Sequence, residues 1–155
     1  MELLNEFLIQ YGYAGMCIAA FLAGSFVPFN SEVVMVALLA ASDMNPWLTV
    51  IWGTVGNVAG AMFNYYVGRL GDADSIAKRI HLKKSGVERV NHLVRKFGGL
   101  MGFFTFLPAI GTVICLVLGV MRANPFVVLV TSTIGKFLRY AILAYMVSYY
   151  CPLNF

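Results

Sequence analysis

Three ionisable residues lie deep within long apolar stretches of the chain, where their chemistry suits the binding of an anion. Glu32 lies in the stretch 12–42, and Lys136 and Arg139 lie in the stretch 126–150. Such groups cost about 2.5–3.5 kcal/mol each within a membrane span, so we expect them to face a cavity and to pair. Because Lys136 and Arg139 are three residues apart, they share one face of a helix and form a compact dication.

Glu32 adds a titratable carboxylate to this cationic pair. Burial disfavours the charged carboxylate and a nearby cation favours it, so its protonation can change when an anionic ligand arrives or leaves. Pro28 interrupts the helix just before it, and Asn30 and Ser31 can satisfy the freed backbone groups and orient the carboxylate. The sequence therefore assigns proton coupling to Glu32 and anion binding to four residues: Asn30, Ser31, Lys136 and Arg139. The alternative is an internal ion pair that only fastens two parts of the protein together.

The composition places these residues in a membrane protein. Sixty per cent of the 155 residues are hydrophobic, 12% are charged, and the mean hydropathy is +0.79. A soluble domain of this length could not cover that much apolar surface. We expect one all-α integral membrane domain over residues 1–155, in contact with the lipid bilayer.

Signatures of catalysis and of metal binding are missing from the sequence. It contains no Gly-x-Ser-x-Gly elbow, no phosphate-binding glycine–lysine loop and no HExxH pair. Glu32 has no second acid at comparable depth for general acid–base hydrolysis. The spacing of Cys17, Cys115 and Cys151 indicates neither a disulfide framework nor a zinc site. We therefore expect no enzymatic activity, no catalytic residue, no metal, no cofactor and no nucleic-acid partner.

The basic residues gather in the middle of the chain. Residues 69–96 contain eight of the eleven Lys and Arg residues and three acids, hence a formal charge of +5. The positive-inside tendency predicts that this linker is cytoplasmic. Its second half spaces four apolar residues as in a basic amphipathic helix that lies on an anionic leaflet, namely Val87, Val90, Val94 and Phe97. A helix surrounded by solvent is the alternative.

Four apolar stretches flank the basic linker: 12–42, 47–68, 98–121 and 126–150. Each approaches or exceeds the roughly 20 residues that cross a bilayer. The second and fourth are uniform, and we expect them to be spans. The first is interrupted near its middle by Pro28, and the third by Pro108 and Gly111.

The two halves of the chain, 12–68 and 98–150, resemble each other. Residues 46–57 align with residues 125–136 at an offset of 79. Repeats with interrupted apolar segments at matching positions are typical of transporters. We therefore expect the first and third stretches to be re-entrant hairpins of an inverted repeat, because irregular backbone at membrane depth requires cover from protein or from a watery cavity. Kinked full spans are the alternative.

Three segments of the sequence resemble the DedA family of membrane proteins, also called SNARE-associated or VTT-domain proteins. They are GSFVPFNSEVVMVAL, GNVAGAMFNYYVGRLG and GKFLRY, and the likeness is greatest to the small YqaA-like bacterial branch. The resemblance covers about residues 12–148. It implies two re-entrant hairpins that meet at mid-membrane in the bacterial inner membrane. For other members it implies transport of a polyprenyl-phosphate carrier lipid with protons involved, and eukaryotic relatives scramble phospholipids.

The chain departs from the family pattern at several charged positions. Larger members carry an acid where this chain has Gly24, and arginines where it has Thr105 and Gly111; the YqaA-like branch commonly has Asp where it has Thr112. The positions that match are Pro28, Ser31, Glu32, Pro108, Gly111, Lys136 and Arg139. Phosphate binding by Lys136 and Arg139 is therefore a hypothesis from this sequence and not a property carried over from the family.

These observations favour a flippase for a lipid phosphate, either polyprenyl phosphate or a phospholipid, with an anionic membrane lipid as cargo. The alternative is a membrane assembly or structural subunit that does not transport, in which Gly56 and Gly60 form a packing face for a partner. The sequence leaves the oligomeric state open, a homo-oligomer included.

Overall fold

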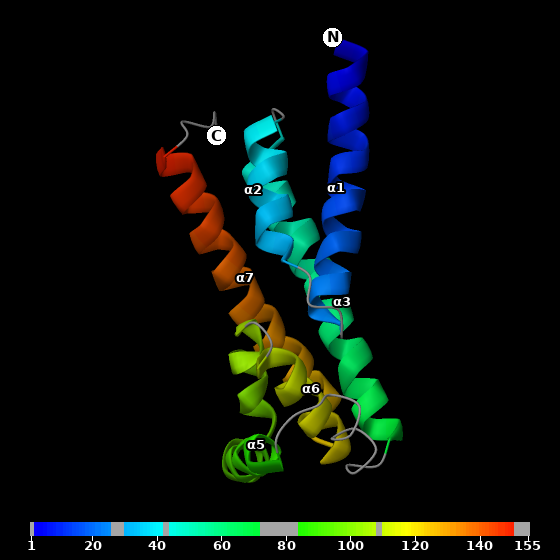
Figure 1. The fold of residues 1–155 in the computed structure, drawn as a ribbon, viewed down its shortest axis with the longest axis vertical. Coiled ribbons are helices and arrows are strands. Elements are labelled where there is room, and N and C mark those ends of the chain that lie inside the picture. The colour runs from blue at the N-terminus through cyan, green and yellow to red at the C-terminus, as the bar shows by residue number, and fades with distance from the viewer. Residues whose placement is uncertain (1, 26–29, 42–43, 72–83, 108–109, 151–155) are drawn as a thin grey trace. The chain divides into compact units, whose positions relative to one another are not determined.

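A computed structural model describes residues 2–25, 30–41, 44–71, 84–107 and 110–150 of the chain. Within these ranges the chain is helical and contains no strand, which confirms the all-α fold class (Figure 1). Pro28 and Pro108 lie outside the described residues. The elements are α1 (Glu2–Gly24), α2 (Ser31–Ala41), α3 (Pro46–Leu70), α5 (Lys84–Phe97), the 3-10 helix η1 (Gly98–Phe106), α6 (Ile110–Val120) and α7 (Pro125–Tyr150).

The described residues divide into two compact units. The first unit lies within residues 1–60 and 137–155, and the second within residues 61–136. The first unit holds α1, α2, the first part of α3 and the last part of α7. The second holds α5, η1, α6, the last part of α3 and the first part of α7. Each unit thus contains a portion of both α3 and α7.

In the first unit, α1 and α2 run antiparallel. Gly12, in the middle of α1, packs against the second half of α2, where a Cβ added to it would lie 3.6 Å from Leu38. At its C-terminal end α1 stops at Gly24, and the Ser25 hydroxyl donates to the Phe21 carbonyl at 2.8 Å. The helix begins at Glu2, ten residues before the apolar stretch predicted from residue 12, because the polar residues at its start are compatible with helix.

In the second unit, η1 and α6 form the corresponding pair. Gly111, the second residue of α6, lies so close to η1 that an added Cβ would be 2.2 Å from the Thr105 carbonyl oxygen. Glycine is needed here because no side chain fits between the two backbones. Gly98 starts η1 with φ of 56°, which turns the chain sharply at the end of α5.

The helix boundaries reproduce the repeat that was predicted from the sequence. Helices α2 and α6 have 11 residues each and start 79 positions apart, at Ser31 and Ile110. Helices α3 and α7 also start 79 positions apart, and each begins at the proline of an Asn-Pro step. The Asn45 side chain accepts from the Trp47 amide, and its counterpart Asn124 accepts from the Phe126 amide, both at 3.0 Å. The repeat therefore extends to the helix caps.

Glycines allow the helices to approach at backbone distance. Cβ atoms added to Gly56 and Gly60 of α3 would lie 2.1 Å and 2.4 Å from the carbonyl oxygens of Cys17 and Phe21 in α1. These two glycines, predicted to serve assembly with a partner, thus pack against α1 within the first unit. In the second unit, Gly68 meets α6 in the same way, at 2.2 Å from the Leu116 carbonyl. Such small-residue contacts are typical of helices in membranes.

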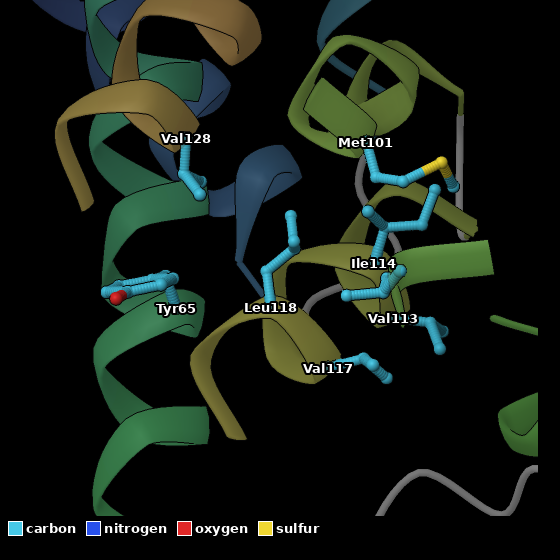
Figure 2. Packing of buried hydrophobic residues seen from close by; sticks show 8 residues of the cluster. Tyr65, Met101, Val113, Ile114, Val117, Leu118 and Val128 are labelled. Carbon is cyan, nitrogen blue, oxygen red and sulfur yellow. The ribbon is translucent and has the colours of Figure 1, made fainter. Parts of the chain in front are cut away.

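A hydrophobic cluster occupies the interior of the second unit (Figure 2). Leu118 and Ile114 of α6 lie at its centre, with Met101 of η1 on one side and Tyr65 of α3 on the other. Val94 of α5 is 1% exposed and joins the same cluster. One residue of the predicted apolar stripe, Val94, therefore packs into the protein. The side chains of Val87 and Val90 lie outside the described residues, and the position of the helix on a leaflet stays a prediction.

Hydrogen bonds tie the end of α3 to the turn between α6 and α7. The Tyr65 hydroxyl donates to the Ala123 carbonyl at 2.5 Å, and Arg69 donates to the Tyr65 hydroxyl at 3.0 Å. The basic linker follows directly after α3 in the chain. In the second unit, the α6–α7 turn thus lies at the end from which the basic linker departs.

Among the described helices, α7 alone is both long and apolar enough to cross a membrane by itself. This agrees with the span predicted for residues 126–150. Helix α3 has 25 residues but carries four glycines and two asparagines, so a span over residues 47–68 stays a prediction. Helices α2 and α6, with 11 residues each, extend over about 16 Å, roughly half of the hydrocarbon core.

Candidate anion-binding site

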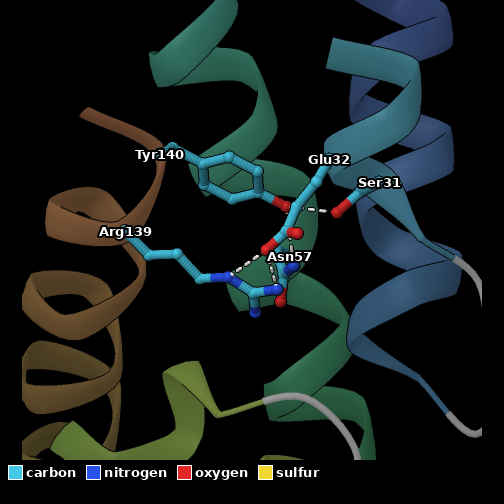
Figure 3. A network of polar contacts seen from close by, with 5 residues as sticks. All are labelled: Ser31, Glu32, Asn57, Arg139 and Tyr140. Atoms are coloured by element: carbon cyan, nitrogen blue, oxygen red, sulfur yellow. Dashed lines mark hydrogen bonds and ion pairs between the residues drawn. The ribbon is translucent and has the colours of Figure 1, made fainter. Parts of the chain in front are cut away.

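The centre of the candidate site is an ion pair between Glu32 at the start of α2 and Arg139 in α7 (Figure 3). The guanidinium donates through Nε to Glu32 Oε1 at 2.6 Å, and Nη2 contacts the same oxygen. The two side chains are 31% and 24% exposed, so neither is fully withdrawn from the surroundings of the protein. The sequence predicted that Glu32 pairs with a cation of the last span, and the structure places Arg139 in that position.

A buried set of hydrogen bonds lies beside the ion pair. The Tyr140 hydroxyl bonds to the Ser31 hydroxyl at 2.7 Å and accepts from the Asn57 amide nitrogen at 2.8 Å. All three side chains are at most 7% exposed. Because Ser31 and Glu32 are neighbours on α2, and Arg139 and Tyr140 are neighbours on α7, the two contacts run side by side (Figure 3).

The local sequence explains this arrangement. Helix α2 starts at Ser31, which places the Glu32 carboxylate in its first turn, where the helix dipole favours negative charge. Tyr140 is 1% exposed and packs in the hydrophobic cluster of the first unit, against Met16, Met35 and Val50 among others. Gly53 of α3 lies against that ring, since a Cβ added there would be in ordinary contact with Tyr140 Cε1 at 3.7 Å. The ring therefore has a fixed place, and its hydroxyl joins α2, α3 and α7.

The other residues predicted for the site have mixed positions. Asn30 is exposed and directly precedes α2. Lys136 is 4% exposed and belongs to the second unit, one turn before Arg139 on α7. Gly111 lies at the close contact between α6 and η1. Binding of an anion by Asn30, Ser31, Lys136 and Arg139 stays a prediction.

Two residues of the network were not assigned to the site from the sequence. Asn57 lies in the middle of an apolar stretch, and a buried amide at such depth needs hydrogen-bond partners, which is a signal that could have singled it out. Tyr140 follows Arg139 directly, but a tyrosine in a mostly apolar helix is common, so its role depends on the fold. The tertiary structure brings both to Ser31.

We expect Tyr140→Phe to lower the stability of the protein by about 1–3 kcal/mol, because the change removes the oxygen that Ser31 and Asn57 both contact in a buried setting. Thermal unfolding in detergent measures this as a lower Tm. Tyr145→Phe, which removes an exposed hydroxyl from the same helix, is the control and should shift the free energy by less than about 0.5 kcal/mol.

A double-mutant cycle identifies the pair responsible. Ser31→Ala and Tyr140→Phe remove the same hydrogen bond. The double variant should therefore lose less stability than the sum of the two single losses, by about 0.5 kcal/mol or more. Fully additive losses would show that the bond between Ser31 and Tyr140 contributes nothing.

Chemically, the site offers a guanidinium whose present partner is a carboxylate of the same chain. A guanidinium matches a phosphate as well as a carboxylate, in a bidentate geometry. Among the described residues no group of three His, Cys, Asp or Glu side chains is placed to hold a metal ion. The absence of enzymatic activity stays a prediction. Because its guanidinium can bind either a carboxylate or a phosphate, the site suits the exchange of one anion for another.

Comparison with known proteins identifies the family. The sequence profile of the VTT domain matches residues 27–149. Inner membrane protein YqaA of Escherichia coli is 30% identical over 128 residues, which cover 81% of this chain and 84% of that protein. A protein of Haemophilus influenzae is 30% identical over 142 residues, which cover 84% of both chains.

A further relative carries a function in its name. Undecaprenyl phosphate transporter A of Staphylococcus aureus is 27% identical over 145 residues, which cover 86% of this chain and 71% of that protein. No solved structure matches the chain. Since the profile covers most of the sequence and relatives at 30% identity include an inner membrane protein, the chain belongs to the VTT-domain (DedA) family of membrane proteins.

Proposed function

We propose that the protein is a transporter of a lipid phosphate in the bacterial inner membrane, in which the cargo phosphate and the Glu32 carboxylate compete for Arg139. The observation that carries the proposal is the ion pair itself. Both partners are partly exposed, and they lie beside a buried network that holds α2, α3 and α7 together. An exposed guanidinium can exchange its partner without breaking the packed part of the site.

The chemical class of the cargo follows from the cation and from the relatives. Arginine suits the planar, bidentate recognition of phosphate. The Staphylococcus aureus relative is named a transporter of undecaprenyl phosphate, which supports a polyprenyl phosphate or a phospholipid as cargo here. Purified protein in liposomes tests the proposal: it should move a labelled lipid phosphate between leaflets without any partner protein.

Proton coupling follows from the competition. When Glu32 takes up a proton, its attraction to Arg139 falls and the guanidinium becomes available to the phosphate. When Glu32 loses the proton, the carboxylate displaces the cargo. A pH gradient across the membrane would then bias loading on one side and release on the other.

The proposed topology is an inverted repeat with two re-entrant pairs, α1–α2 and η1–α6. Three observations support it: the antiparallel course of α1 and α2, the short length of α2 and α6, and the position of the α6–α7 turn beside the end of α3. In a protein with four full crossings, that turn and the basic linker would lie on opposite faces. On the proposed topology the basic linker and the turn face the cytoplasm.

Matched cysteines test the topology. Trp47 and Phe126 are exposed, occupy equivalent positions 79 residues apart, and follow the Asn-Pro steps that start α3 and α7. In a variant whose three natural cysteines are replaced by alanine, Trp47→Cys should be labelled from outside and Phe126→Cys from the cytoplasmic side. Glu88→Cys in the linker should be labelled together with Phe126→Cys. Labelling of both equivalent positions from one side would show four full crossings instead.

The alternative function is a membrane assembly or structural subunit in which the ion pair only fastens helices. The contact of one guanidinium with one carboxylate oxygen through two nitrogens is compatible with a permanent clasp. Failure of the purified protein to move any lipid phosphate, together with loss of the fold on breaking the ion pair, would favour this function. Gly56 and Gly60 would not supply the partner face, because α1 covers them.

A further inference from the structure

Helix α5 has more apolar surface than its packing in the protein uses. Val94 is 1% exposed and anchors the helix in the cluster of the second unit. Leu93 and Phe97 lie four residues apart, so they share a second face, and they are 42% and 47% exposed. We define this outward surface of Leu93 and Phe97 as the α5 shoulder.

A charged residue borders the α5 shoulder, and this distinguishes it from the exposed apolar surfaces of the long helices. Lys96 lies next to it, with Nζ 5.6 Å from the centre of the Phe97 ring. Glu88 and Arg95 are exposed and lie on the far side of the helix by their spacing. A surface with such a border cannot lie in the hydrocarbon core, but it fits the boundary between head groups and acyl chains.

The orientation of α5 agrees with a position at the boundary between head groups and acyl chains. Figure 1 views α5 nearly along its axis, whereas the portions of α6 and α7 in the same unit run across the view, so α5 lies crosswise to them. Gly98, with φ of 56°, makes the turn from α5 into η1. A helix that lies crosswise to membrane helices at their end runs along the membrane surface.

We propose that the α5 shoulder docks on acidic lipid head groups of the leaflet at this end of the protein. Leu93 and Phe97 enter the boundary region, and Lys96 extends along the Phe97 ring to a phosphate. The match of exposed cations to an acidic surface selects this partner over a second copy of the chain, which would bring the same positive charges together.

Tryptophan fluorescence of the full-length protein tests the docking, and transport is not part of the measurement. The chain has two tryptophans, Trp47 and Trp52, both exposed, so a Trp47→Phe/Trp52→Phe background is free of other signals. Leu93→Trp reports on the α5 shoulder, and Glu88→Trp reports on the far side of the same helix. The protein is reconstituted in vesicles of phosphatidylcholine alone or with one third phosphatidylglycerol.

In the acidic vesicles, Leu93→Trp should be quenched by lipid brominated near the head group and should be several times less accessible to acrylamide than Glu88→Trp. The protection should weaken in pure phosphatidylcholine. Adding Lys96→Gln should reduce the ratio of docked to undocked helix by roughly fivefold. Raising the salt concentration should act in the same direction.

Three results would overturn the proposal. Equal acrylamide access at both positions would show a helix surrounded by solvent. Shielding of Leu93→Trp from acrylamide and from brominated lipid alike would show that protein covers the shoulder. Identical protection in neutral and acidic vesicles would show that acidic head groups are not recognised.

Discussion

Glu32→Gln is expected to bind a lipid phosphate about tenfold more tightly than the natural chain, and to transport it without dependence on a pH gradient. The substitution keeps the size and one acceptor oxygen of the side chain but removes the charge that competes for Arg139. A tenfold change corresponds to about 1.4 kcal/mol, close to the lower end of the roughly 1.5–3 kcal/mol of a hydrogen bond to a charged group. Lipid retention in native mass spectra measures the binding, and liposomes with and without a pH gradient measure the coupling.

The control for Glu32→Gln separates transport from folding. The variant should stay monodisperse in detergent, because the buried bonds of Tyr140 to Ser31 and Asn57 do not involve the carboxylate. If Glu32→Gln aggregates and the double variant Glu32→Gln/Arg139→Gln recovers, the ion pair is structural. A pH dependence equal to that of the natural chain would exclude Glu32 as the proton-coupling group.

Arg139→Lys is expected to lower the retention of a lipid phosphate by about tenfold or more, although the charge is kept. Arginine presents two parallel N–H donors to two oxygens of a phosphate, and the lysine ammonium is a point charge that cannot reproduce this fork. The same loss should appear as a slower initial rate of lipid transfer in liposomes. Native mass spectra and transfer rates therefore measure the same contact in two ways.

Two comparison variants sharpen this experiment. Arg95→Lys makes the same exchange on α5, outside the candidate site, and should leave cargo retention unchanged. Lys136→Ala should weaken retention as well, if the second cation predicted from the sequence contributes its charge. Full retention in both Arg139→Lys and Lys136→Ala would favour the structural subunit over the transporter.

Much of the fold was predictable because membrane sequences follow a few strong physical rules. Apolar length indicates spans, and the stretch 126–150 indeed forms the long apolar helix α7. The offset of 79 residues between the halves was visible in the alignment of 46–57 with 125–136, and it recurs in the starts of α2 and α6. The family was predictable from three short segments, since they include the matching charged positions.

The division of the molecule into packed units was not predictable. Gly56 and Gly60 have the spacing of a partner-binding face, and sequence spacing alone does not show which helix they meet. In the structure they contact α1, because only glycine lets the carbonyl oxygens of α1 approach the backbone of α3 so closely. The spacing of the apolar residues on α5 likewise does not show which of them are buried. Val94 packs in the cluster of the second unit, whereas Phe97 is exposed.

The sequence by itself determined that Glu32 needs a cation and that the last span supplies two. A charge in an apolar segment is unstable without a partner, and this rule requires no coordinates. Only the tertiary structure decided that Arg139 is the cation described at Glu32, and that Tyr140 joins Ser31 to Asn57 beside it. These contacts link residues more than 80 positions apart in the chain, and such pairings follow from how three helices pack and not from any local pattern.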